Sequence, residues 1–305
     1  MRFGNKTFER MGFGAWQLGN SEFFDAMSVE EGIELVKKSV ELGVKFFDTA
    51  PGYASGKSES ILGIALKDVR DQVFINSKFG HRADGSSSFD ERTMELAVRE
   101  SLERLQTSYL DSLILHNPSM DILQGKTKHF QEMKRLKEIG IIHHYGVSID
   151  SYDELNAVLS NTDCDVIELL FNVFSQACIP LFEEIKRRNI LLIIKVPLDS
   201  GWLTGKYNEY TAFRGIKSRW TAEDIVRRSS LTKRLKTMVN DDDLTKYALG
   251  FILSYDAVGV IIPGTRTLEQ LNSNLEALKY KLPNDLKTKM IDFYNSEIKN
   301  NPLPW

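Results

Sequence analysis

Short apolar runs rich in Val, Ile, Leu and Phe alternate along the chain with longer amphipathic, charge-rich stretches. Such runs are typical of parallel strands that are buried on both faces by helices. The pattern predicts strands at 12–16, 44–48, 73–78, 110–116, 141–148, 166–170, 190–195 and 258–262. It predicts helices at about 29–42, 58–67, 91–105, 127–139, 151–160, 180–188, 242–255 and 267–279. This regular succession of strand–helix pairs predicts an α/β fold, a closed (β/α)8 TIM barrel.

The length of the chain is compatible with one barrel. Its 305 residues exceed a usual domain, but single α/β barrels routinely reach this size, so we expect one domain over residues 1–305. A doubly wound sheet would instead need a glycine fingerprint after its first strand. Gly12 and Gly14 supply two of its glycines, but Gln17 stands at the place of the third and no helix pattern begins there.

Two further segments carry structural information. The first ten residues place Phe3 and Phe8 on either side of a Gly-Asn pair, which predicts an N-terminal β-hairpin at the barrel floor. The connection over 196–241 is much longer than the usual connections of a compact domain, and long connections are often functional. Because it contains Trp202 and Trp220, we expect an ordered cover over a ligand.

Composition narrows the class of protein. Hydrophobic residues make up 42% and charged residues 27%, which suits a globular protein with a full core. The net charge of -3 offers no basic excess for nucleic acid, so we expect no nucleic-acid partner. The two cysteines lack disulfide or metal-ligand spacing, so we expect no metal site and a reducing, cytoplasmic location. The absence of a long apolar run leads us to expect no signal peptide and no membrane partner.

Polar residues end three successive apolar runs. Asp48 ends the second predicted strand, Lys78 the third and His116 the fourth, and Tyr53 follows on the loop after Asp48. In a barrel the carboxyl ends of the strands meet at one rim, where catalytic residues lie. A tyrosine hydroxyl is a poor acid at neutral pH, and we expect the ammonium of Lys78 to lower its pKa. These four residues form a proton-transfer set, in which His116 could donate to a substrate oxygen.

Taken singly, each of these residues has an ordinary structural explanation. Asp48 can cap a turn, Lys78 can end a strand in solvent, and His116 can be a satisfied loop histidine. Their joint occurrence at three successive strand ends favours the functional interpretation.

The same residues lie within motifs that run in order along nearly the whole chain. The motifs are Gly43-Val-Lys-Phe-Phe-Asp-Thr-Ala-Pro-Gly-Tyr53, Gly56-Lys-Ser-Glu59 with Leu62-Gly63, Ser77-Lys78, Leu113-Ile-Leu-His116, Gly146-Val-Ser148, Pro197-Leu198 with Leu203-Thr-Gly-Lys-Tyr207, and Ile262-Pro-Gly-Thr-Arg266. In these motifs and in their order the chain resembles the aldo-keto reductases.

The resemblance implies a (β/α)8 barrel that binds NADP(H), or less often NAD(H), and transfers hydride to aldehydes or ketones. Tyr53 would be the general acid, Lys78 and Asp48 would tune it, and His116 would orient the carbonyl.

The resemblance also implies a set of cofactor-binding residues. The nicotinamide end would be held by Ser148, Glu168, Asn172 and Lys195. The pyrophosphate would lie beside Leu198, Ser200, Leu203 and Lys206. The adenosine end would be held by Gly264, Thr265, Arg266, Gln270 and Asn274.

This chain departs from the family pattern at several cofactor positions. Glu168 stands where a Gln is usual, which replaces an amide donor with a possible charge, and Lys195 stands where many members place an aromatic ring. Arg266 offers a charged fork to a 2′-phosphate, which favours NADP(H). Gly264 and Gln270 stand where many NADP-specific relatives carry Lys and Arg, so we expect appreciable use of NAD(H) as well.

Three other functions stay open at this point. The chain could be a cofactor-holding sensor or channel-associated subunit, a sugar dehydrogenase running toward oxidation, or an unrelated barrel enzyme with Lys78 as a Schiff-base amine. The natural carbonyl, the direction of the reaction and the oligomeric state are not fixed by the sequence. Aromatic residues that could line an apolar mouth for a small-molecule carbonyl are Trp16, Phe23, Phe24, Phe79, Trp202 and Trp305.

Overall fold

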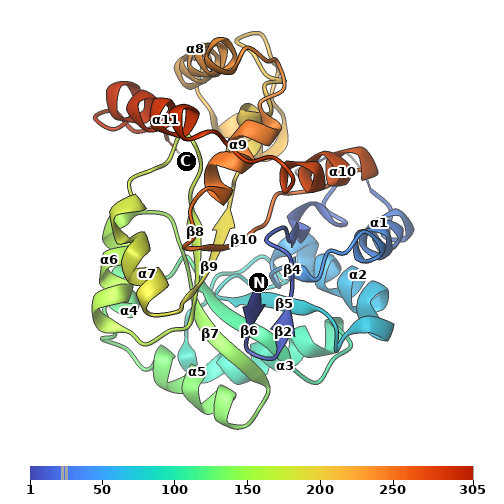
Figure 1. The fold of residues 1–305 in the computed structure, drawn as a ribbon. Coiled ribbons are helices and arrows are strands. Elements are labelled where there is room, and N and C mark those ends of the chain that lie inside the picture. The colour runs from blue at the N-terminus through green and yellow to red at the C-terminus, as the bar shows by residue number, and fades with distance from the viewer. Residues whose placement is uncertain (22–23, 25–26, 305) are drawn as a thin grey trace.

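One parallel sheet forms the centre of the molecule in the computed structural model, which describes residues 1–21, 24 and 27–304 (Figure 1). Each strand pairs with the next one along the chain. The strands are β3 (Phe13–Gly14), β4 (Phe46–Asp48), β5 (Phe74–Phe79), β6 (Leu110–His116), β7 (Ile142–Ile149), β8 (Val166–Leu170), β9 (Leu191–Lys195) and β10 (Val258–Ile261). All the predicted strands are therefore present, although β3 is short because the residues that follow it turn into a 3-10 helix.

The sheet closes on itself between its first and last strands. Met11 forms a parallel bridge with Ile261, and Gly14 forms one with Gly264. The Gly12 amide donates to the Ile261 carbonyl at 2.8 Å across the same seam. The predicted closed (β/α)8 barrel is confirmed.

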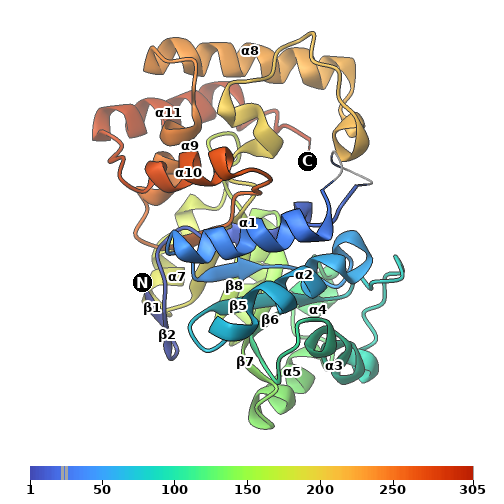
Figure 2. The same cartoon turned by 90° about the vertical axis from the view of Figure 1, so that its right-hand side faces the viewer.

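Helices surround the barrel, as Figures 1 and 2 show. They are α1 (Val29–Glu41), α2 (Lys57–Leu66), α3 (Met94–Arg104), α4 (Met120–Leu123), α5 (His129–Glu138), α6 (Tyr152–Asn161), α7 (Phe182–Arg187), α8 (Ala222–Val239), α9 (Thr245–Leu253), α10 (Leu268–Ala277) and α11 (Asn284–Glu297). None of the helices in the described ranges combines the length and the apolar character needed to span a bilayer.

The sequence pattern missed two long helices outside the repeat. The connection over 196–241 contains one of them, α8, over 18 residues. That helix begins at a capping box in which Thr221 accepts from the Asp224 amide and the Asp224 side chain accepts in return. A second unpredicted helix, α11, runs beside α8 (Figure 2), and Arg227 of α8 donates to the Glu297 carbonyl. Both were missed because only one helix was assigned to each strand.

An N-terminal hairpin closes the barrel floor, as predicted. Its strands are β1 (Arg2–Phe3) and β2 (Lys6–Thr7). Phe3 and Phe8 are buried in one cluster with strand residues that include Phe46 and Phe74. The ring centroids of Phe8 and Phe46 are 5.1 Å apart. These aromatic rings exclude water from the lower half of the barrel.

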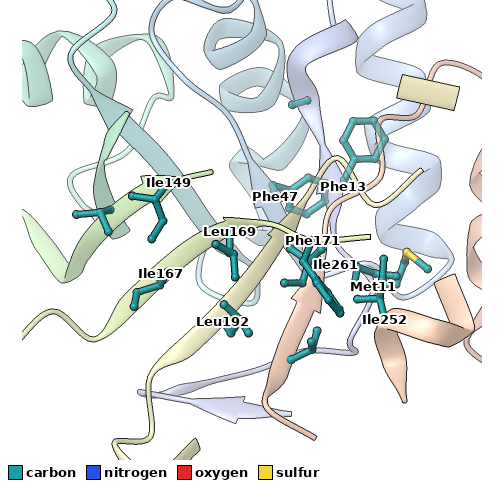
Figure 3. Close-up of a cluster of buried hydrophobic side chains, with 14 of the residues drawn as sticks. Met11, Phe13, Phe47, Ile149, Ile167, Leu169, Phe171, Leu192, Ile252 and Ile261 are labelled. Atoms are coloured by element: carbon teal, nitrogen blue, oxygen red, sulfur yellow. The ribbon is translucent and has the colours of Figure 1, made fainter. Parts of the chain in front are cut away.

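A second apolar layer lies between the strands and the helices. Leu169, Leu192 and Ile261 come from three neighbouring strands and join the same core cluster as Ile252 of α9 (Figure 3). Alternation along each strand therefore sends successive side chains to the helices and to the barrel interior. This alternation decides which polar residues enter the barrel.

The long connection is held in place by a buried ion pair. Arg228 of α8 donates from Nε to Asp199 Oδ2 at 3.1 Å, and from its NH2 group to the Pro304 carbonyl at 2.6 Å. The Arg228 side chain is 1% exposed. The pair therefore fastens the segment after β9 to α8 and to the C-terminal tail.

Replacing Arg228 with Met should lower the free energy of unfolding by about 3–5 kcal/mol, because the Asp199 carboxylate would remain buried without its cation. Urea denaturation followed by tryptophan fluorescence measures this loss as a lower midpoint at an unchanged slope.

The double variant Asp199→Asn with Arg228→Met is the control. It should recover a large part of the lost stability, since it also removes the charge left behind. An equal loss of unfolding free energy in the single and double variants would show that the effect comes from packing rather than from charge.

Candidate active site

The polar residues predicted at the strand ends share the barrel interior. Phe46 and Phe74 point into the interior cluster at the floor. Asp48 lies two residues beyond Phe46, and Asn76 and Lys78 lie two and four residues beyond Phe74. Because side chains alternate with a period of two, these polar groups stand on the same inner face, above the apolar layer.

Lys78 is the centre of this polar layer. Its Nζ lies 2.6 Å from Asp48 Oδ1 and 2.7 Å from Asp48 Oδ2, and it donates to the Thr49 carbonyl at 3.0 Å. Glu168 Oε2 lies 3.5 Å from the same Nζ. Burial alone would lower the pKa of Lys78, but Asp48 and Glu168 outweigh burial and raise it. Lys78 is therefore held as an ammonium ion.

Asp48 differs in its acidity from an ordinary aspartate. Burial, followed by the charge of Glu168, raises the pKa of Asp48 to about 8, although Lys78 opposes both effects. Burial would also raise the pKa of Glu168, but Lys78 and Lys195 outweigh it and lower that pKa. The two carboxylates thus have opposite shifts in the same small volume.

Tyr53 stands at the mouth of the barrel beside Lys78 and His116. The Lys78 Nζ is 5.1 Å from the centroid of its ring, and the His116 ring centroid is 6.0 Å away. Burial raises the pKa of Tyr53; Lys78 lowers it as expected, but Asp48 and Glu168 add to the rise. The expectation of a lowered pKa was therefore wrong, because the sequence did not show that burial and two carboxylates act together on the hydroxyl.

His116 is neutral in this environment. Burial, followed by the charges of Lys78, Lys195 and His81, holds the pKa of His116 well below its usual range. Within residues 1–21, 24 and 27–304, no group is hydrogen-bonded to its Nδ1. His81 was missed as a site residue, yet its ring centroid lies 4.8 Å from that of His116. Only the folded loop after β5 reveals that proximity.

Lys195 does not stand free at the end of β9. Its Nζ donates to Ser148 Oγ at 2.8 Å and to Asn117 Oδ1 at 2.9 Å, and it pairs with Asp150 Oδ1 at 2.8 Å. Ser148 in turn donates to Glu168 Oε1 at 3.0 Å. The predicted nicotinamide residues Ser148, Glu168 and Lys195 therefore form one hydrogen-bonded chain.

Asn172 supports the backbone beside this chain. Its Nδ2 donates to the Val196 carbonyl at 3.0 Å, and its Oδ1 accepts from the Phe174 amide at 2.8 Å. Val196 has a φ of 53°, which is rare for a β-branched residue. Asn172 thus holds a strained turn directly after Lys195.

The segment after β9 has an unusual backbone and collects positive charge. Asp199, Ser200 and Gly201 have φ values of 44°, 54° and 102°. Arg219, which the sequence did not reveal as a site residue, donates to Ser200 Oγ at 3.4 Å. Lys206 is exposed. A turn of this kind beside cations suits a bound phosphate.

The side chains of the predicted pyrophosphate residues are not equally accessible. Leu203 is fully buried, whereas Leu198 and Ser200 are half-buried. Leu203 is buried as a whole residue, and its amide donates to the Leu198 carbonyl at 3.1 Å, so it supports the segment from within.

The predicted adenosine residues gather beyond β10. Thr265 and Asn274 are buried and linked by a 3.3 Å hydrogen bond from Asn274 Nδ2. Gln270 is exposed, and its Oε1 accepts from the Arg266 amide at 2.9 Å. Burial, followed by the charge of Arg266, lowers the pKa of Lys206. Two cations that oppose each other in this way suit a polyanion such as a nucleotide phosphate.

Gln17, which follows β3, is a further residue of the site that the sequence did not reveal. A Cβ on Gly264 would collide with the Gln17 side chain. The Oε1 of Gln17 is buried, with no hydrogen-bond partner in the described ranges. An orphaned polar atom against an exposed glycine fits a ligand that passes close to the backbone at this point.

The expected apolar mouth is smaller than the sequence indicated. Trp16 lies near Tyr53, with ring centroids 6.1 Å apart, and Phe24 packs on Trp16 at 5.4 Å. Trp202 does not line the mouth, because it is 0% exposed. Phe79 is 3% exposed and likewise belongs to the packed core.

Trp202 and Phe79 are buried because other aromatic residues cover them. Trp202 packs on Tyr207, Phe213 and Trp220, and Phe79 packs on Phe89. Phe23 and Trp305 lie outside the described residues. Within those residues no three His, Cys, Asp or Glu side chains converge as a metal site requires.

A closed barrel with Asp, Tyr, Lys and His at its carboxyl rim is typical of barrel enzymes. The model of the Aldo/keto reductase family matches residues 10–292, so the chain belongs to that family of oxidoreductases.

Individual relatives agree over most of the chain. The uncharacterized oxidoreductase YqkF of Bacillus subtilis (strain 168) is 26% identical over 276 residues, which are 88% of this chain and 86% of that protein. Aldo-keto reductase yakc [NADP(+)] of Schizosaccharomyces pombe (strain 972 / ATCC 24843) is 25% identical over 302 residues, 92% of this chain and 87% of that protein.

A solved structure shows the same fold. The crystal structure of the aldo/keto reductase from Klebsiella pneumoniae in complex with NADP and acetate has a TM-score of 0.72 and 21% identity. The match covers 97% of this chain and 95% of that chain.

The His116 imidazole should remain neutral through the neutral pH range and take up a proton only in more acidic solution than an ordinary histidine. Proton–nitrogen NMR of the imidazoles as a function of pH measures this midpoint.

Lys195→Met should move the His116 midpoint upward, because it removes one of the charges that oppose protonation. The matched change Lys186→Met, on the exposed face of α7, should leave the midpoint in place. A His116 titration within the normal range in the unmodified protein would contradict the burial and charge seen here.

Proposed function

We propose that this protein is an NADP(H)-dependent aldo-keto reductase that reduces an aldehyde or a ketone to an alcohol, with Tyr53 as the general acid. One observation carries the proposal: Tyr53 and a neutral His116 meet at the mouth of the barrel beside the Lys78 ammonium. A small-molecule carbonyl that approaches this mouth would find two hydrogen-bond donors for one oxygen.

The raised pKa of Tyr53 supports a role as proton donor. The hydroxyl keeps its proton at neutral pH and can give it to an oxygen on which negative charge develops. Lys78, fixed by Asp48 and by the Thr49 carbonyl, stabilises the tyrosinate that remains. Neutral His116 donates a hydrogen bond to the same oxygen and orients it.

NADPH would supply the hydride when bound. Ser148, Asn172 and Lys195 are the groups of this chain that would face its nicotinamide end, with Glu168 behind them. The left-handed turn at Ser200 and the exposed Lys206 would hold its pyrophosphate.

Arg266 supports a preference for NADP(H) over NAD(H). After burial, the charge of Arg266 is the next cause that lowers the pKa of Lys206, so two cations gather where a 2′-phosphate would add negative charge. The name of the yeast relative includes NADP(+), and the Klebsiella structure contains NADP, which supports the same choice. Gly264 and Gln270 add no charge, so NAD(H) should still be used appreciably.

The alternative with Lys78 as a Schiff-base amine is disfavoured. A nucleophilic amine must be neutral, whereas Asp48 and Glu168 overcome the effect of burial and raise the pKa of Lys78. We propose that residues 1–305 act as one domain in the cytoplasm, in keeping with two free, buried cysteines, Cys164 and Cys178.

NADPH and NADH consumption across a panel of aldehydes, ketones and aldoses tests the proposed activity directly. Reduction of carbonyls supports it. Tight NADPH binding without turnover would identify a cofactor-holding subunit instead, and turnover only of sugars with NADP⁺ would identify a sugar dehydrogenase.

Tyr53→Phe should lower kcat/KM for carbonyl reduction by about 10²-fold or more, because it removes the proton donor and little else. NADPH binding, followed by fluorescence titration, should change by no more than a few-fold. Retention of activity within about threefold would remove Tyr53 from the proposed role.

Arg266→Ala should raise the Kd for NADPH about tenfold or more and barely change that for NADH, since a charged hydrogen bond to the 2′-phosphate is worth roughly 1.5–3 kcal/mol. Isothermal titration with both cofactors measures the difference.

Arg187→Ala is the matched control, because Arg187 is an exposed arginine on α7 and should affect neither Kd. Equal losses for both cofactors in Arg266→Ala would show that Arg266 supports the fold or the shared pyrophosphate.

A further inference from the structure

Glu168 is a buried charge that the proposed mechanism does not use. It lies on β8, it is 2% exposed, and it faces the catalytic lysine from the far side of the barrel interior. Asp48 already supplies Lys78 with a carboxylate at 2.6 Å. A second carboxylate in a closed interior is costly unless it is paired or protonated. Its presence needs a physical explanation.

The two carboxylates share their hydrogen-bond donors. Asn76 Nδ2 donates to Asp48 Oδ2 at 2.7 Å and to Glu168 Oε2 at 3.4 Å. Lys78 Nζ lies 2.7 Å from that Asp48 oxygen and 3.5 Å from that Glu168 oxygen. One amide nitrogen and one ammonium nitrogen thus bridge the same two oxygen atoms. The two oxygens are therefore neighbours.

The charges at this point do not balance if both acids are ionised. Lys78 supplies one positive charge, while Asp48 and Glu168 together would supply two negative charges. Lys195 is separated from Glu168 by Ser148, and Lys195 is itself paired with Asp150. When two carboxylates share a buried site, one of them binds a proton much more tightly than an isolated acid does.

The other titratable groups around the pair do not remove this excess. His116 on β6 is neutral, and Tyr53 is a protonated phenol at neutral pH. Asn76 and Ser112 on β5 and β6 are uncharged, and Ser112 donates to Asn76 Oδ1 at 2.5 Å. Lys78 is therefore the only cation in direct contact with the pair among the described residues.

We propose that Asp48 and Glu168 form a carboxylate pair around Lys78 that holds one shared proton at neutral pH, so that Glu168 is a positioning residue that sets the charge beside Tyr53. With the proton bound, the ammonium and the pair together are neutral. After its release they carry one net negative charge, which opposes ionisation of the nearby Tyr53 hydroxyl.

The shared proton has a route to the rim of the barrel. Glu168 Oε1 accepts from Ser148 Oγ, which accepts from Lys195 Nζ. The Lys195 side chain is 13% exposed. On ionisation the pair loses the proton to solvent and gains one negative charge, and no other group need change. The pairing is a property of the ligand-free cluster, whereas its effect on catalysis rests on the proposed function of Tyr53.

Glu168→Gln tests the pair, because it keeps the shape of the side chain and removes its charge. Carbon-13 NMR of carboxyl-labelled aspartate and glutamate, recorded without cofactor or substrate, measures the titration of each buried acid. The unmodified protein should show one carboxyl that titrates with a midpoint of about 8. In Glu168→Gln that midpoint should fall by about two pH units or more, because the neighbouring negative charge is gone.

Two further variants complete the test. Asp48→Asn should also abolish the alkaline step, since each partner is needed, and it replaces Glu168→Gln if that variant fails to fold. Glu59→Gln is the matched control, because Glu59 is a buried carboxylate that accepts from Ser77 on the opposite face of β5. It should leave the midpoint unchanged.

The titration separates this inference from the proposed enzyme activity. An identical midpoint in the unmodified protein and in Glu168→Gln overturns the pair, whatever the enzyme reduces. The lack of any carboxyl that titrates on the alkaline side in the unmodified protein overturns it as well. The protein could fail to reduce carbonyls while a carboxyl still titrates on the alkaline side and that titration depends on both acids. This result would support the carboxylate pair and contradict the proposed function.

Discussion

The ammonium of Lys78 inside the barrel is the interaction on which the rest of the site depends. Its side chain is 0% exposed, so water contributes nothing to its solvation. Asp48 and the Thr49 carbonyl replace that water, and Glu168 adds a weaker contact. Charges in such an enclosed volume act on one another more strongly than they do in water. Burial, followed by this ammonium, holds the pKa of His116 low, and the ammonium also stabilises an ionised Tyr53.

The enclosed volume is itself a product of the barrel architecture. Phe3 and Phe8 of the N-terminal segment pack with Phe46 and Phe74 and close the floor of the barrel. The polar layer stands directly on this apolar plug. The charged groups of this layer must find their hydrogen-bond and charge partners within the protein, because the apolar floor keeps solvent away from below. This requirement explains why the cluster is so densely hydrogen-bonded.

The segment after β9 brings strain and charge to the same rim. Val196, Asp199 and Ser200 all adopt positive φ values, which side chains larger than glycine adopt at a cost. Asn172 holds the first of these turns, and Arg228 holds the second by its contact with Asp199. A backbone fixed in this way can present its amides to a phosphate without further ordering. The C-terminal tail helps to hold Arg228 in place, because the Pro304 carbonyl accepts a hydrogen bond from that side chain.

The sequence by itself determined the strands, the closed barrel, the family and the residue types at the rim. Period-two alternation and the polar ends of apolar runs are local signals, so Asp48, Lys78 and His116 could be identified without a structure. It did not predict α8 and α11, because both helices lie outside the regular succession of one helix after each strand. The burial of Trp202 was also hidden, since it depends on packing against aromatic residues from several turns of the connection.

The tertiary structure alone decided the electrostatics of the site. Asp48 and Glu168 lie on β4 and β8, which do not pair in the sheet and meet only across the closed interior. Burial, together with that meeting, raises the pKa of Tyr53 even though Lys78 lies beside it. A pKa depends on the distances to every nearby charge and on access to water. Neither quantity exists in a linear sequence, because both are fixed only when the barrel closes.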